Sequence, residues 1–127
     1  MNPYDAANNL AKALRGSAEF KELKEAQKAL KNDEKALEML KDFRKEQLNL
    51  QKQQLSGVEV SKEQQEKLEK LYEVISLNLT VKRYVEAEYR AIKLLQDVQK
   101  AINEATAEIF DEQLMGLPEK ESGDEEA

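Results

Sequence analysis

The sequence predicts an all-α protein. Hydrophobic residues make up 40% of the chain and charged residues 36%, with only four glycines and two prolines. This mixture is typical of long helices that have one apolar face and one solvated face. Aromatic residues are few, and strand-forming runs rich in Val, Ile, Thr and Tyr are nearly absent. We therefore expect about five helices in a bundle-like array, with a long C-terminal helix, associating as a dimer.

The first helix is predicted at the start of the chain. Asn2 followed by Pro3 is a typical helix start, because an asparagine side chain can accept a free backbone N–H and proline has no N–H to leave unbonded. We expect this helix to run to about residue 15. Gly16 should then take a left-handed conformation, and Ser17 should cap the next helix.

The second and third helices are separated by a polar break. The second helix carries Gln27 among its apolar residues and should end at Asn32-Asp33. The third is expected over residues 34–55 and should stop at Ser56-Gly57. Its apolar residues cover a broad arc, which predicts neighbours on two sides.

The last two helices have clear signals at their starts and ends. Ser61 and Gln64 have the spacing of a capping box, so a fourth helix should begin there and run to about Leu77. Asn78 and Thr80 are expected to form a break. The fifth and longest helix is then expected over residues 81–113, ended by Gly116-Leu117-Pro118.

The net charge of −6 is unevenly distributed. Residues 119–127 hold five acids and one lysine and so contribute −4, which leaves −2 for residues 1–118. We expect a single helical domain over residues 1–118 and a disordered acidic tail over residues 119–127. A nearly neutral body with an acidic tail does not suit phosphate binding, so no direct contact with nucleic acid is expected.

Residue types argue against catalysis and metal binding. The chain has no cysteine and no histidine, which excludes disulfides, thiolate or imidazole metal ligands and Cys- or His-based nucleophile pairs. A glycine-rich phosphate loop is also absent. We expect no enzyme activity and no cofactor. The N-terminus lacks an apolar signal, and the longest uncharged run has only eight residues, so we expect a cytoplasmic protein without a membrane contact.

Helix length predicts self-association. At about 1.5 Å per residue, a helix over residues 81–113 would be about 50 Å long, well beyond the radius of a compact chain of this size. Its apolar stripe would remain open to water unless a second copy covered it. We expect a homodimer whose apolar face includes Phe43, Leu50, Ile92, Leu95, Val98, Ile102 and Ile109.

Polar residues also fall on the apolar sides of the two long helices. They are Arg44, Gln47, Gln51, Gln54 and Glu88. One interpretation is that they are edge residues whose long stems lie along the surface. Another is a buried polar layer in which Arg44 and Glu88 pair and the glutamines bond across helices, fixing register or oligomeric state. A functional pocket is the third.

Several segments of the chain resemble the YlbF/YmcA family, and most of all its YheA-like branch. They are residues 42–51 (DFRKEQLNLQ) and 54–57 (QLSG), the opening from Tyr4 to Phe20, and residues 86–90 (EAEYR). The resemblance covers nearly residues 1–114. It implies a small helical protein, usually dimeric or part of larger complexes. Better-known members act with a further protein on ribonuclease Y in Gram-positive bacteria. Some hold iron–sulfur clusters through cysteines, which this chain lacks.

The function predicted from these observations is a non-catalytic regulatory adaptor. It would bind itself and another protein through exposed helix faces. The family resemblance implies a link to RNA processing and developmental regulation. The alternative is a structural or chaperone-like helical scaffold whose main activity is self-association.

Overall fold

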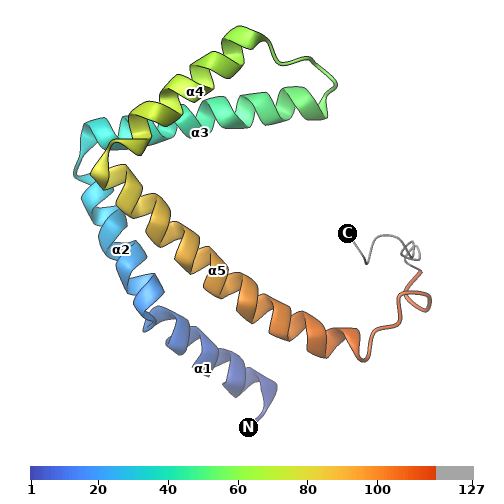
Figure 1. Ribbon diagram of the computed structural model, residues 1–127. Helices are drawn as coiled ribbons and strands as arrows, with labels where there is room; N and C mark the ends of the chain where they lie inside the picture. Colours follow the sequence, from blue (N-terminus) through green and yellow to red (C-terminus); the bar gives the residue numbers. More distant parts are fainter. Residues whose placement is uncertain (117–127) are drawn as a thin grey trace. The chain divides into compact units, whose positions relative to one another are not determined.

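The computed structural model describes residues 1–116, and these form five helices (Figure 1). The helices are α1 (Pro3–Arg15), α2 (Ala18–Lys31), α3 (Glu34–Leu55), α4 (Lys62–Ser76) and α5 (Leu79–Ala107). The predicted all-α class with a long C-terminal helix is confirmed. Within residues 1–116, no helix combines the length and apolar character needed to cross a bilayer. The predicted tail, residues 119–127, lies outside the described residues.

The predicted helix starts are confirmed by their capping contacts. The Asn2 side chain accepts the Asp5 backbone N–H at 2.8 Å, and the Ser17 hydroxyl accepts that of Phe20 at 3.2 Å. At α4 the Ser61 hydroxyl accepts the backbone N–H of Gln64, and the Gln64 side chain accepts that of Ser61. These contacts satisfy N–H groups that the first turn of a helix leaves unbonded.

The left-handed conformation predicted for Gly16 is wrong. Its φ of −88° is right-handed, and its N–H still bonds to the carbonyl of Lys12. The chain enters α2 almost at once, because Ser17 both caps α2 and donates its hydroxyl to the carbonyl of Leu14. A left-handed glycine occurs instead at Gly57, just after α3, with φ +77°.

The predicted bounds of the last helix, 81–113, also need correction. The Asn78 side chain accepts the N–H of Val81 at 3.0 Å, which is the contact of a capping residue, so Thr80 lies inside the helix. At the other end the helix stops at Ala107. The Thr106 hydroxyl bonds to the carbonyl of Asn103, and the Asp111 carboxylate accepts the N–H of Gln113. Such side chains compete with the helical backbone, and the segment turns.

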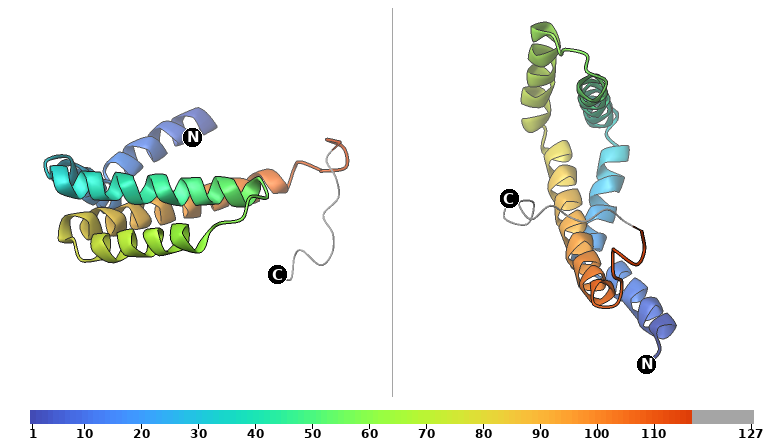
Figure 2. Two further views of the ribbon diagram at one scale, coloured as in Figure 1. Left: turned by 90° about the horizontal axis from the view of Figure 1, so that it is seen from above. Right: turned by 90° about the vertical axis from the view of Figure 1, so that its right-hand side faces the viewer.

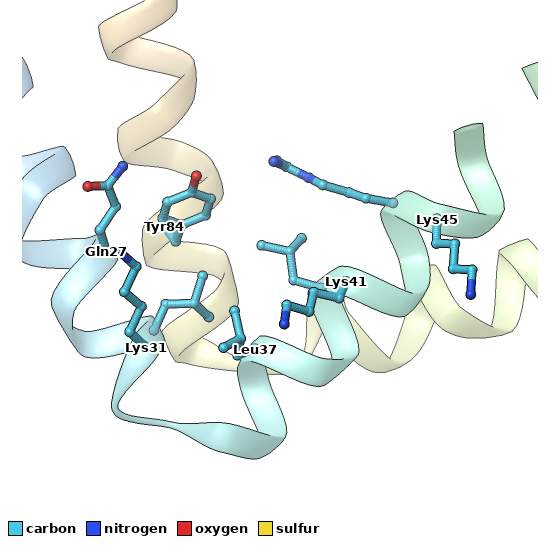
Figure 3. A pocket seen from close by; sticks show the side chains of 9 residues that line it. Gln27, Lys31, Leu37, Lys41, Lys45 and Tyr84 are labelled. Atoms are coloured by element: carbon cyan, nitrogen blue, oxygen red, sulfur yellow. The ribbon is translucent and has the colours of Figure 1, made fainter. Parts of the chain in front are cut away.

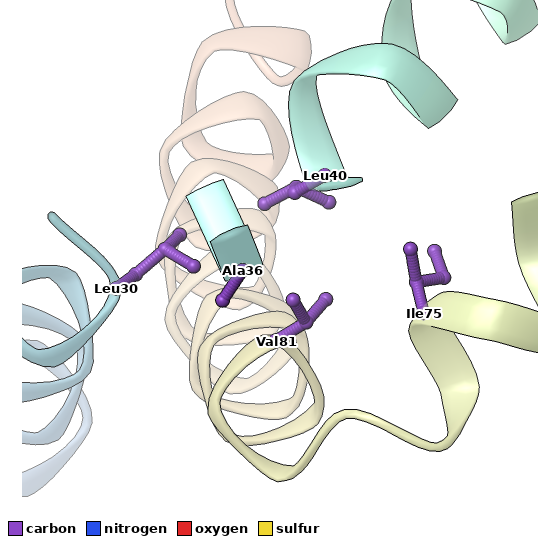
Figure 4. Packing of buried hydrophobic residues seen from close by; sticks show 5 residues of the cluster. All are labelled: Leu30, Ala36, Leu40, Ile75 and Val81. Atoms are coloured by element: carbon purple, nitrogen blue, oxygen red, sulfur yellow. The ribbon is translucent and has the colours of Figure 1, made fainter. Parts of the chain in front are cut away.

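Residues 1–91 form one compact unit with its own small core (Figure 4). The core joins side chains of α2, α3, α4 and the start of α5, namely Leu30, Ala36, Leu40, Ile75 and Val81. Val81 is only 1% exposed and Leu40 5%. Leu37, Met39, Phe43 and Tyr84 pack against this cluster and are partly buried.

Within this unit α3 and α4 form an antiparallel hairpin, seen side by side in Figures 1 and 2. The ring of Phe43 lies 5.9 Å from that of Tyr72, and the Lys67 ammonium lies 3.5 Å from the Glu46 carboxylate. An aromatic contact and an ion pair therefore add to the core contacts between the two helices.

A second unit begins at Ile92 and contains the C-terminal part of α5 and the turns that follow, as far as residue 116 is described. Ile92, Leu95 and Ile102 recur at helical spacing, and each is 44–45% exposed. Ile109 is 76% exposed. This unit thus presents a row of large apolar side chains to solvent.

Candidate binding pocket in the first unit

A polar network joins α3 to the N-terminal part of α5. The Arg44 guanidinium donates two hydrogen bonds to the Glu88 carboxylate, at 3.0 and 2.6 Å. The Tyr84 hydroxyl donates a third to the same carboxylate at 2.8 Å. The guanidinium carbon also lies 5.8 Å from the centre of the Tyr84 ring. A bidentate pair of this kind fixes direction as well as distance.

The network shifts the acidity of its members. Hydrogen bonds from Arg44 lower the pKa of Glu88 against the opposing effect of burial, and the bond from Tyr84 adds to the lowering. The bond to Glu88 raises the pKa of Arg44. Burial, followed by the hydrogen bond to Glu88, raises the pKa of Tyr84. All three groups are therefore held in the states that form this network at neutral pH.

A pocket of about 470 Å³ lies beside this network, between α2, α3 and α5 (Figure 3). Its apolar wall is made of Leu30, Leu37, Leu40 and the Tyr84 ring. The volume is in the range of sites that hold a bulky side chain or a small ligand.

The rim of the pocket is basic. Lys31 of α2 and Lys41 of α3 flank it, and Lys45 and Arg44 continue the basic row along α3. Among residues 1–116, the three lysines have no acidic partner within ion-pair distance. Lys41 and Lys45 are also four residues apart on one helix, where like charges repel. The pocket thus combines an apolar wall with unbalanced positive charge.

A similar but more exposed ionic contact ties α2 to α5. The Arg83 guanidinium lies 2.9 Å from the Glu22 carboxylate and 3.5 Å from that of Glu25. The bond from Arg83 lowers the pKa of Glu22. This exposed contact links α2, which supplies Leu30 and Lys31 to the pocket, to α5.

The predicted polar layer is only partly assembled in one chain. Arg44 and Glu88 lie together, with side chains 42% and 23% exposed. Gln47, Gln51 and Gln54 are exposed on α3. In the single chain the pair therefore lies at the edge of the packed region, and the glutamines face solvent.

Some residues of the predicted apolar dimer face are buried within the single chain, and others are exposed. Leu50 is buried within the first unit, and Phe43 is half-buried against the core, so neither offers much surface to a partner. Val98 is half-buried. The other predicted residues are exposed, namely Ile92, Leu95, Ile102 and Ile109.

Sequence reasoning missed the basic rim. Gln27 was noticed as a polar residue among apolar ones, and it lines the pocket. A signal was present on α3, where Leu37 and Leu40 are followed by the basic residues Lys41 and Arg44. An apolar pair followed by close like charges indicates a surface that attracts an acidic partner.

We expect the Arg44–Glu88 pair to contribute about 1 kcal/mol to the free energy of unfolding, because it is bidentate but partly open to solvent. Since the folded pKa of Glu88 is lowered, this contribution is present above the ordinary glutamate pKa and is lost as the pH falls through the folded value. Glu88→Gln should therefore flatten the loss of stability below about pH 4.5. Urea unfolding at several pH values measures this.

Glu86→Gln is the matched control. Glu86 is on the same helix and is exposed, and its contact with Arg90 is long, at 3.9 Å. The substitution should therefore change the free energy of unfolding very little. A double-mutant cycle of Glu88→Gln with Arg44→Met isolates the pair. Sedimentation of the same variants tests the register hypothesis, which fails if both folding and oligomeric state are unchanged.

The fold and the pocket define a small all-helical protein with a basic pocket in its first unit and an exposed apolar row in its second. Residues 4–106 match the family model described as "Control of competence regulator ComK, YlbF/YmcA". The chain belongs to this family.

Similar proteins have the same size and, where solved, the same fold. A UPF0342 protein of Caldicellulosiruptor saccharolyticus is 42% identical over 104 residues, covering 82% of this chain and 87% of its own. One from Caldicellulosiruptor bescii is 38% identical and covers 94% and 98%. A solved structure, a protein of unknown function (DUF964) from Bacillus stearothermophilus, matches with a TM-score of 0.70 at 25% identity, covering 84% of this chain and 93% of its own.

Proposed function

We propose that this protein is a non-catalytic regulatory adaptor that forms a homodimer and binds another protein in the cytoplasm. The observation that carries the proposal is the row of exposed apolar side chains in the second unit, Ile92, Leu95, Ile102 and Ile109. Several large apolar side chains exposed on one face of a helix are typical of protein contact sites. Ile92, Leu95 and Ile102 recur at helical spacing along α5, and Ile109 follows just beyond its end.

Family membership supports a regulatory role. The family description names control of a competence regulator, and we extend that kind of role to this chain. We place the chain in the YheA-like branch, on the residues quoted above. Through this likeness we propose that its partner belongs to the ribonuclease Y machinery.

The alternative is a self-associating scaffold. Exposed apolar residues also occur in the first unit, including Leu55 at the end of α3 and Leu77 after α4. Such residues could allow copies to add in more than one direction, and a non-closing contact produces open-ended assemblies. A closed dimer favours the adaptor, and open-ended oligomers favour the scaffold.

Sedimentation of the purified chain tests the self-association. We expect a dimer at about 10 µM protomer, because covering the row of the second unit removes several large apolar side chains from water. A stable monomer at this concentration would contradict the proposal. A mass that rises steadily with concentration would favour the scaffold instead.

Crosslinking with mass spectrometry in the native cell tests the adaptor role. We expect crosslinks from residues 92–116 to a second protein as well as to another copy. Replicates that recover only self-crosslinks would argue against an adaptor. The control is a strain carrying Leu95→Glu with Ile102→Glu, in which crosslinks that depend on the apolar row should disappear.

A further inference from the structure

We infer that the basic pocket of the first unit receives the acidic segment formed by residues 104–115 of a second copy. The inference rests on the proposed homodimer and specifies which surfaces of two copies meet. The pocket and the segment carry opposite charges, and each also has apolar side chains that the other can cover.

The pocket side offers cations around an apolar wall. Lys31 and Lys41 flank the wall formed by Leu30, Leu37 and Leu40, and neither lysine has an acidic partner among residues 1–116. Figure 3 shows these two lysines on different helices, with Lys45 pointing away from Tyr84. An acidic group between Lys31 and Lys41 would balance their charge, and the wall would receive an apolar side chain.

The segment side offers the opposite pattern. Residues 101–116 contain four acids and no lysine or arginine. Glu108 and Glu112 have no cationic partner within residues 1–116. Between and beside them are Ile109 and Phe110, 76% and 56% exposed. The segment thus has bulky apolar side chains flanked by unpaired carboxylates.

The spacing along α5 fits both surfaces into one dimer. The exposed row from Ile92 to Ile102 has its midpoint at residue 97. If two copies pair this row in antiparallel directions, positions equally far from residue 97 lie opposite one another. Ala107, the last residue of α5, and Ala87 are both ten positions from it, so the segment that follows α5 in one copy begins opposite the part of α5 that carries the polar network in the other.

Antiparallel pairing also closes the assembly. In a two-fold dimer every contact occurs twice, so each copy gives its segment and receives the other's. Both acidic segments and both basic pockets are then occupied. No unpaired interface remains to which a third copy could add.

Charge exchange between two variants tests the inference. Lys31→Glu with Lys41→Glu makes the pocket acidic, and Glu108→Lys with Glu112→Lys makes the segment basic. Each double variant alone should self-associate about tenfold more weakly or worse, because like charges then meet in both copies of the contact. An equimolar mixture of the two should recover wild-type affinity, because both contacts in the mixed dimer again pair opposite charges.

Lys24→Glu with Lys35→Glu is the matched control on the same two helices, outside the pocket, and should leave the dimer unchanged. If wild type is dimeric and the pocket variant dissociates no more readily than this control, the inference is overturned while the proposed homodimer stands. If wild type is monomeric, the proposed function itself fails.

A second measurement does not depend on affinity. The chain has no cysteine, so single cysteines report only the chosen positions. Mixing Gln27→Cys chains with Asp111→Cys chains and adding a short bismaleimide should give a crosslinked heterodimer. The pair Glu69→Cys and Asp111→Cys, with Glu69 on α4, should not. Equal crosslinking of both pairs would contradict the inference.

Discussion

Leu40→Ala is expected to lower the free energy of unfolding by about 2–5 kcal/mol, because it removes buried methyl groups and leaves a cavity. Leu40 is 5% exposed and belongs to the only cluster of buried residues that joins α2, α3, α4 and α5 within the described part of the first unit. The cluster has five buried members, so losing one affects every helix it joins. Urea unfolding followed by circular dichroism measures the change at a fixed protomer concentration.

Leu55→Ala is the control for this prediction. Leu55 is the last residue of the same helix and is 84% exposed, so the same substitution should change stability by less than about 0.5 kcal/mol. Both variants should be compared at the same protomer concentration, since dimer formation adds to apparent stability. Equal losses would mean that Leu40 does not belong to a packed core in solution.

The sequence predicted the helices well where a local signal defined them. Asn2, Ser17 and Ser61 are capping residues whose side chains reach only three positions along the chain, so their role can be recognised without knowing the fold. α3 was predicted with its observed bounds for the same reason. Errors arose where one residue type allows two structures. Asn78 does separate α4 from α5 as expected, but because its side chain caps α5, Thr80 lies inside that helix and not in the break.

The candidate site was harder to predict, because its residues come from separate helices. The pairing of Arg44 with Glu88 was one hypothesis among three, since angular position on a helix shows a shared face but not the partner across it. Lys31 and Lys41 are ordinary surface lysines in the sequence. They become a rim only when α2 and α3 bring them to the same pocket. Contacts between distant positions cannot be inferred from helical period alone.

The stability of the first unit and the surface of the second have different physical bases. Leu30, Leu40 and Val81 are buried within one copy, so their contribution does not require a partner. Ile92, Leu95 and Ile102 remain about half exposed, so their apolar surface contributes only if something covers it. A variant of the first kind should therefore change unfolding, and one of the second kind should change association.

Leu95→Glu with Ile102→Glu is the variant of the second kind, and we expect it to weaken self-association by about a hundredfold or more. A dimer of the variant would bury four unpaired carboxylates, two from each copy, and burying unpaired charges in an apolar contact is costly. Sedimentation should show a monomer at about 10 µM where wild type is a dimer. Circular dichroism should show unchanged helix content, because glutamate is a good helix former and both positions are exposed in the single chain.

Lys100→Gln with Ala101→Glu is the matched control for this last prediction. It makes the net charge more negative by the same two charges on the same helix, at positions that helical spacing places away from the row of Ile92, Leu95 and Ile102. The control should remain dimeric, which separates the effect of burying carboxylates from that of net charge. If both double variants dissociate equally, general repulsion explains the result. If neither does, the copies associate through another face, and the exposed row of α5 is free to bind the second protein.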